Sequence, residues 1–311
     1  MTRLGLTRRQ AGLLAVLAGV LASTVLTACG QGTGPRADVT GPRADVTGFD
    51  KRATAVAAAW RSSGAIEAWR TGLVPLGEFT QVLGFDDRSD LKDAFAAGRI
   101  GVSGTLPDTT GMGEVRFPDG SIKVVRLVGA RTAYTAFIAA GQGPCPTDAR
   151  CSGVVITGAT LGTTTLLTSR GEATVPAWRF SVAGLTQPII RVAIDPAALT
   201  VPPAPTLEAG DGRPPTDLGV EVASLLGVSG NEIRYRMLIG ACETNPRPLL
   251  HEEPDIIVVG GTVTPQPAGS ACTLNLVAAP VSVTTSKPVG DRPIVEAMLG
   301  KAVVVSRFPP G

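Results

Sequence analysis

A short apolar run near the start of the chain, followed closely by a cysteine, constrains what the remainder can fold into. Residues 11–22 are all Ala, Gly, Leu or Val, and three arginines and no acid precede them. About a dozen residues are too few for a helix that spans a hydrocarbon core of roughly 30 Å, but they match the core of a signal peptide. We therefore predict that residues 1–28 are a removable signal and that the folded protein follows Cys29. The alternative is a retained helix.

The residues at 26–29, Leu-Thr-Ala-Cys, resemble the lipobox of bacterial lipoproteins. The resemblance implies that the Cys29 thiol carries a thioether-linked diacylglyceryl group and becomes the mature N-terminus. Two or more acyl chains anchor a protein stably, because each buried CH₂ contributes about 0.8 kcal/mol. The expected localisation is thus the cell membrane, with the lipid-anchored chain on its extracytoplasmic face. Residues 7–9 are also similar to a twin-arginine signal, but Ala11 replaces the usual Phe, so both export routes stay open.

The charge of the mature chain excludes one class of partner. The whole sequence has 28 basic and 26 acidic residues, and loss of the three signal arginines leaves 25 against 26. A near-neutral chain gives no electrostatic basis for binding nucleic acid. Aromatic residues make up 4% of the sequence, which argues against a large surface for stacking sugars or bases. The abundance of Arg, Ala, Gly and Pro is similar to that of proteins from high-GC genomes, as in actinobacteria.

Four further cysteines, at positions 145, 151, 242 and 272, allow three disulfide pairings. An oxidising compartment favours disulfides, and we predict the pairs Cys145–Cys151 and Cys242–Cys272, because each pair lies within one predicted domain. A zinc site is the alternative. The spacing of the first pair and the presence of a single histidine both oppose it. We predict no bound metal and no cofactor.

Residues 29–49 are predicted to be a flexible tether. The heptad Gly-Pro-Arg-Ala-Asp-Val-Thr at 34–40 is repeated without change at 41–47. A repeat this rich in Pro, Gly and charge cannot bury an apolar face, so it is typical of a spacer between membrane and domain. A duplication without function is the alternative.

Residues 50–195 are predicted to form an α+β domain. Helical spacing of apolar residues indicates a helix over 50–70 that includes Trp60 and Trp69. We interpret the two tryptophans as core or docking anchors; a ligand-binding box is the alternative. Two more helices, a hairpin around Pro118-Asp119-Gly120 and a run of strands follow; the helices are expected at 89–98 and 131–140, and the strands at 154–156, 164–168, 174–182 and 189–194. Pro176 predicts that its strand lies at an edge or contains a bulge.

The order of these elements, with Val175-Pro-Ala-Trp-Arg-Phe180, resembles the cystatin-like or PepSY-like arrangement of a helix and an antiparallel sheet. The resemblance covers about 65 residues, and it implies a binding or inhibitory module.

The C-terminal part is predicted to be a second, all-β domain over 218–311, after a Pro-rich linker at 196–217. Its strands are expected at 233–239, 255–259, 273–277 and 281–285. Residues 289–293, Val-Gly-Asp-Arg-Pro, are similar to a Pro-Leu-Gly-Asp-Arg turn of uncharacterised actinobacterial exported proteins. The pattern predicts a turn at the glycine and local hydrogen bonding by Asp291 and Arg292.

His251 is the single histidine of the chain, so any histidine-based catalysis depends on it. The sequence has no Gly-x-Ser-x-Gly elbow and no His-Glu-x-x-His motif. We therefore predict no catalytic residue and interpret His251 as part of a solvated loop. The alternative is a hydrolase in which His251 acts as a general base beside Glu252, or in which a pair of carboxylates acts.

These observations predict a membrane-anchored, non-enzymatic binding module whose partner is an envelope protein, a peptide or an apolar ligand. The alternatives are an envelope hydrolase and a carrier of lipid or of a small apolar ligand. An apolar cavity would favour the carrier. A cleft that joins His251 to a serine and an acid would favour the hydrolase. An exposed apolar patch without a pocket would favour a protein interaction module.

Overall fold

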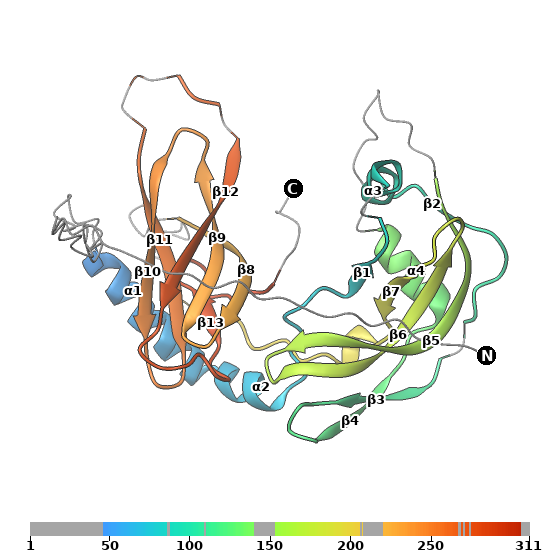
Figure 1. Cartoon of the computed structure of the whole chain (residues 1–311). Coiled ribbons are helices and arrows are strands. Elements are labelled where there is room, and N and C mark those ends of the chain that lie inside the picture. Colours follow the sequence, from blue (N-terminus) through green and yellow to red (C-terminus); the bar gives the residue numbers. More distant parts are fainter. Residues whose placement is uncertain are drawn as a thin grey trace, which may run out of the picture. The chain divides into compact units, whose positions relative to one another are not determined.

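The computed structural model describes residues 46–85, 88–108, 110–139, 153–205, 207, 220–266, 269, 271–273 and 275–305 (Figure 1). Over these ranges the chain is a mixed α+β protein in which strands predominate, in agreement with the predicted fold class. In the same ranges no helix has the length and apolar character needed to cross a membrane. Cys29, the predicted Cys145–Cys151 disulfide and half of the predicted linker lie outside the described residues, so the domain boundaries stay a prediction.

The predicted first helix is two helices separated by a glycine. Helix α1 covers Val46–Ser62 and α2 covers Ala65–Thr71, and Gly64 between them has a φ of 76°. A positive φ suits glycine because it has no Cβ, so Gly64 ends one helix and redirects the chain into the next. The first helix begins inside the predicted tether, four residues earlier than expected.

The apolar side of α1 and α2 packs against strands from the C-terminal part of the chain. Its buried residues are Phe49, Ala53, Val56, Ala57, Trp60, Ala65, Ile66 and Trp69, and they cluster with Ile256, Val258, Val295 and Ala297. The indole N–H of Trp60 donates to the carbonyl of Gly300 at 2.7 Å, and that of Trp69 donates to the carbonyl of Asp291 at 2.9 Å. The prediction that both tryptophans are core anchors is therefore confirmed. Their partners lie in the part of the chain that the sequence assigned to the second domain.

Seven strands of the described region form one sheet between residues 80 and 192. They are β1 (Thr80–Val82), β2 (Ile100–Val102), β3 (Met112–Arg116), β4 (Ile122–Arg126), β5 (Val154–Thr168), β6 (Gly171–Val182) and β7 (Ile189–Val192). The order β1-β7-β6-β3-β4 is completed by β5, which pairs with β6, and by β2, which pairs with β5. A turn at 169–171 joins β5 to β6, and the predicted hairpin turn at 118–120 is present between β3 and β4. The two predicted strands at 154–156 and 164–168 are one continuous strand, β5.

Two short helices cover one face of this sheet. They are α3 (Ser89–Ala96) and α4 (Ala130–Ile138), close to their predicted bounds, and they contact β5 and β7 respectively. Ala130 and Ala133 of α4 belong to the same buried cluster as Trp178 and Phe180 of β6. Small side chains let the helix approach the sheet closely, so α4 is held directly over β6 and β7.

Pro176 lies in a central strand, so the prediction of an edge strand or a bulge there was wrong. Its strand β6 pairs with β5 on one side and with β3 and β7 on the other, and the register shift of the β5–β6 pair falls at 156–158 instead. The Pro176 carbonyl accepts from the N–H of Ala193 at 2.9 Å. In a β-strand the N–H and C=O of one residue point to the same side. On that side of β6, strand β3 pairs at Thr174 and strand β7 pairs from Ala177 onward. Pro176 lies between these two partners, so the N–H that proline lacks is not needed for pairing.

Two three-stranded sheets make up the described part after residue 220. One has the order β12-β9-β8 and the other β10-β11-β13. The strands are β8 (Val222–Ser229), β9 (Glu232–Gly240), β10 (Thr244–Glu252), β11 (Ile257–Thr264), β12 (Leu276–Thr284) and β13 (Ile294–Glu296). The strands β8, β10 and β13 were not predicted, and the last two predicted strands are joined in β12.

Strand β11 shows why the run at 256–259 is apolar throughout. Ile257 and Val259 pack with Tyr235 and Met237 of β9, whereas Ile256 and Val258 pack with α1 and α2. Alternate side chains of a strand point to opposite faces, so a strand buried on both faces has no polar positions. The described half of the predicted disulfide pairing is confirmed: Cys242 and Cys272 are bonded, with their Cα atoms 6.0 Å apart.

Candidate functional site

His251 lies within strand β10, opposite Val258 of β11, so its assignment to a loop was wrong. Its Nε2 lies 3.1 Å from Oε1 of Glu253 and its Nδ1 lies 3.7 Å from Oδ1 of Asp50. Arg61 binds Glu253 and also Asp255. Burial acts to raise the pKa of Glu253, but Arg61 and His251 lower it overall. Among the described residues, the polar partners of His251 are the carboxylates of Asp50 and Glu253. In the described part of the chain, the group is therefore a network of ion pairs.

Glu252, the residue proposed to assist His251, interacts with a different partner. One carboxylate oxygen accepts from Nη1 of Arg292 at 2.8 Å and the other from the N–H of Ser286 at 2.6 Å. Burial acts to raise the pKa of Glu252, but these bonds favour the charged form and lower it to about 2. Neighbouring residues of a strand face opposite sides, so His251 and Glu252 serve separate contacts.

Arg292 fulfils the prediction that it bonds locally. Its Nε donates to the carbonyl of Val289, Nη1 to Glu252 and the carbonyl of Glu253, and Nη2 to the carbonyls of Lys287 and Pro288. A guanidinium has five N–H donors, so all five are used. With its side chain 8% exposed, Arg292 is a structural clamp that joins the turn before β13 to the end of β10.

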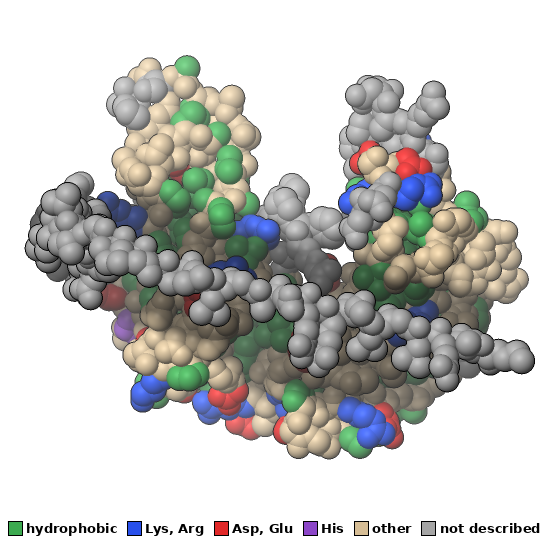
Figure 2. Space-filling view, viewed as in Figure 1, with side chains coloured by type: hydrophobic (Ala, Val, Ile, Leu, Met, Phe, Trp, Pro, Cys, Tyr) green, Lys and Arg blue, Asp and Glu red, His purple; other side chains and the backbone are tan. Residues whose placement is uncertain are grey.

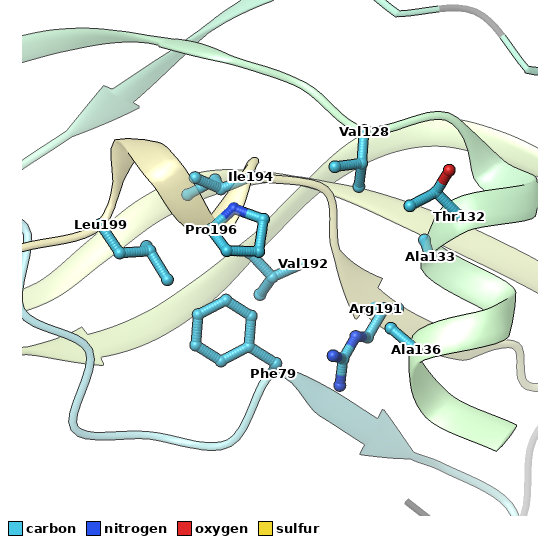
Figure 3. Close-up of a pocket in the computed structure, with 10 residues that line it drawn as sticks. All are labelled: Phe79, Val128, Thr132, Ala133, Ala136, Arg191, Val192, Ile194, Pro196 and Leu199. Carbon is cyan, nitrogen blue, oxygen red and sulfur yellow. The ribbon is translucent and has the colours of Figure 1, made fainter. Parts of the chain in front are cut away.

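A pocket of about 270 Å³ lies between α4, β7 and the short helix η1 (Pro196–Ala198) (Figure 3). Its lining is apolar apart from a threonine and an arginine: Phe79, Val128, Thr132, Ala133, Ala136, Arg191, Val192, Ile194, Pro196 and Leu199. Thr132, Ala136 and Pro196 are exposed, so the pocket opens to solvent. The lower limit for typical ligand pockets is about 300 Å³, so this one suits a small molecule.

The pocket lies where the pairing of β1 with β7 ends, at Thr80 and Arg191. Thr80 of β1 faces Arg191, and the last backbone bond between the two segments joins the N–H of Val192 to the carbonyl of Phe79 at 2.9 Å. Phe79 follows residues 76 and 77, which bond to the carbonyl of Leu167 in β5 and not to β7. In Figure 3 its ring lies opposite the alanines of α4, with the side chain of Arg191 between them. Because Ala133 and Ala136 are small, the helix leaves open space beside the ring and the Arg191 side chain.

Arg191 is the single charged residue of the pocket lining. Its Nη1 donates to the hydroxyl of Thr80 at 2.6 Å, and its guanidinium carbon lies 5.6 Å from the centre of the Phe79 ring. Among the described residues it forms no ion pair, and one of its five donors has a protein partner. Burial lowers the pKa of Arg191, because desolvation disfavours the charged form.

The unused donors of Arg191 remain accessible. In the described region, the one completely enclosed side-chain polar atom without a partner is the hydroxyl of Ser224. The guanidinium nitrogens of Arg191 that lack a protein partner are therefore not completely enclosed. The arrangement offers an apolar slot with one cation on its wall.

Sequence reasoning missed this pocket, although one signal for it exists. Arg191 interrupts the run Ile-Ile-Arg-Val-Ala-Ile at 189–194. A lone cation within a buried strand indicates either a partner or a ligand, but the choice depends on where β1 and α4 lie.

Apolar side chains also gather over β9 and β12 in the space-filling view (Figure 2). Leu276 and Val277 there are 64% and 44% exposed. These side chains lie on an exposed face of the sheet and not in the pocket described above.

Comparisons of the chain with protein-family models, with curated proteins and with solved structures find no match. The site must therefore be interpreted from its own chemistry.

Proposed function

We propose that this protein is a lipid-anchored, extracytoplasmic binding protein that holds a small apolar chain in the pocket between α4, β7 and η1. The observation that carries the proposal is the apolar lining of that pocket, formed by Phe79, Val192 and Leu199 with the alanines of α4. At about 30 Å³ for a water-sized group, the volume accommodates about nine non-hydrogen atoms. This supports the carrier among the functions predicted from sequence. The proposed cystatin-like or PepSY-like order of helix and sheet is consistent with a binding module.

The alternative of a hydrolase receives less support from the site. His251 is engaged by two carboxylates and Glu252 by Arg292, so the two residues do not act on a common atom. A general base needs a free lone pair within reach of a nucleophile. No such nucleophile is in contact with His251 in the described residues.

The proposed anchor is the acylated Cys29 at the end of the predicted tether. Cells fed a radioactive fatty acid should yield a labelled product from the natural sequence and an unlabelled one from Cys29→Ala, which should also leave the membrane fraction. An unlabelled natural product would contradict the anchor. The ligand proposal would then stand without it, because the pocket does not depend on the lipid.

The pocket itself is tested by titrating the full chain with 1-octanol, which has nine non-hydrogen atoms, in a calorimeter. Each buried CH₂ contributes about 0.8 kcal/mol, so we expect a dissociation constant on the order of 0.1–1 mM. Ala136→Trp should abolish binding because the new ring fills the slot. Ala58→Trp is the matched control, since Ala58 is an exposed alanine of helix α1 and does not line the pocket. Equal binding by the two variants would contradict the proposal.

A further inference from the structure

Arg191 limits which apolar chains the pocket selects. We propose that the natural ligand is a short acyl chain ending in a carboxylate, which binds the guanidinium of Arg191 while the chain occupies the apolar slot. This inference rests on the proposed function and adds the chemical class of the ligand to it.

The first support is the position of the cation. Arg191 lies on the pocket wall, and its Nη1 is held by the Thr80 hydroxyl at 2.6 Å. The Phe79 ring flanks the guanidinium at 5.6 Å. These two contacts restrict the motion of the side chain and leave Nη2 and Nε without a protein partner in the described region. Two adjacent N–H groups of a guanidinium match the two oxygens of a carboxylate.

The second support is the charge of the site. Desolvation penalises a buried cation, and an anion within about 4 Å compensates that penalty. No acidic side chain lines the pocket, so a ligand is the available source of the anion. One guanidinium balances one carboxylate. A phosphate monoester carries a charge of about −1.5 to −2, which would leave excess negative charge against apolar walls.

The third support is the match of polar and apolar parts. The remaining lining is hydrocarbon apart from the hydroxyl of Thr132, which is exposed. A molecule with one charged end and an unbranched apolar remainder satisfies both regions. A sugar or a peptide would bury polar groups that find no partner in this lining.

The experiment compares three eight-carbon ligands, octanoate, 1-octanol and octylamine, by calorimetric titration of the full chain at neutral pH. Charge-assisted hydrogen bonds are worth more than neutral ones, so octanoate should bind at least tenfold more tightly than 1-octanol, and octylamine more weakly than either. The ratio of octanoate to octanol affinity in the natural sequence needs no variant, so it stays informative even if a substitution impairs folding.

Variants of Arg191 assign the effect to the guanidinium. Arg191→Met should keep octanol binding and reduce the octanoate-to-octanol ratio to about one. Arg191→Lys should give an intermediate ratio, because an ammonium keeps the charge but loses the planar fork. Arg179→Met is the matched control. Arg179 is an exposed arginine of the neighbouring strand β6, bonded to the carbonyl of Thr163, and does not line the pocket.

The outcomes separate the two proposals. Equal affinity for octanoate and octanol, or a preference that survives in Arg191→Met, would overturn the carboxylate proposal and leave the apolar pocket supported. Failure of all three ligands to bind would contradict the proposed function, and the carboxylate proposal with it. Tighter binding of octyl phosphate than of octanoate would also overturn the choice of a carboxylate.

Discussion

Two arginines in this protein, Arg292 near β13 and Arg191 in β7, occupy half-buried or buried positions and have opposite surroundings. Arg292 uses all five of its donors on protein acceptors, and its charge faces Glu252 at 2.8 Å. Arg191 uses one donor on Thr80 and, among the described residues, faces no carboxylate. A buried cation is costly unless it is paired and bonded. The first arginine therefore belongs to the structure, whereas the second lacks a compensating anion.

The backbone around each arginine explains the difference. Around Arg292 the turn at 287–290 directs three carbonyls inward, so the guanidinium is enclosed by the chain that carries it. Around Arg191 the segment that precedes Phe79 bonds to β5 and not to β7, and helix α4 presents alanines. An arginine whose donors are all bonded to the surrounding backbone, as in Arg292, stabilises the structure. An arginine whose donors are left without protein partners beside a pocket, as in Arg191, is available to bind a ligand.

Removing the clamp should have the largest effect on stability. Arg292→Ala leaves the half-buried carboxylate of Glu252 without its cation, and it removes the side-chain donor from four carbonyls, so we expect the free energy of unfolding to fall by about 3–5 kcal/mol. Urea denaturation followed by circular dichroism measures the change. Arg292→Lys should recover only part of it, because an ammonium cannot reach all of these acceptors. A loss below about 1 kcal/mol for Arg292→Ala would mean that the clamp is not structural.

Removing the partner of the clamp should have an intermediate and pH-dependent effect. Glu252→Gln should cost about 1.5–3 kcal/mol at neutral pH, the range for hydrogen bonds to charged groups. The pKa of Glu252 is lowered from 4.5 to about 2 in the folded state, so its contribution is present above pH 4.5 and is lost as the pH falls to about 2. The difference between the natural chain and Glu252→Gln should therefore shrink over that interval.

Denaturation curves at pH 7, 4 and 2.5 provide the measurement for Glu252. Glu114→Gln is the control, because Glu114 pairs with Arg116 at an exposed position of the β3–β4 hairpin and should change stability by less than about 1 kcal/mol. A difference for Glu252→Gln that is constant with pH would contradict the assigned ion pair.

Removing Arg191 should have the smallest effect on stability. Without ligand the guanidinium carries a desolvation cost and one hydrogen bond, so Arg191→Met should change the free energy of unfolding by less than about 1 kcal/mol or increase it. The same denaturation experiment measures it. A loss comparable to that of Arg292→Ala would place Arg191 among the structural residues and remove the contrast between the two regions.

The sequence predicted most elements of the fold whose signals are local. Helical spacing identified the helices that carry Trp60 and Trp69, and the turn residues at 118–120 identified the β3–β4 hairpin. Strand β10 was missed because Pro246 and Pro248 interrupt its pattern. The central position of Pro176 could not be predicted, since it depends on where β3 ends and β7 begins. The pocket was missed for the same reason: Phe79, Ala136 and Arg191 are far apart in sequence and meet only through the sheet.

We propose above that the guanidinium of Arg191 binds the carboxylate of a ligand. A crystal structure of the full chain grown with octanoate tests this proposal most directly. The account predicts a carboxylate within about 2.7–2.9 Å of the free guanidinium nitrogens of Arg191, the distance range of charge-assisted bonds, with the alkyl chain against Phe79, Val192 and Leu199. An empty pocket in which Arg191 is bonded to a carboxylate of the protein itself would contradict it.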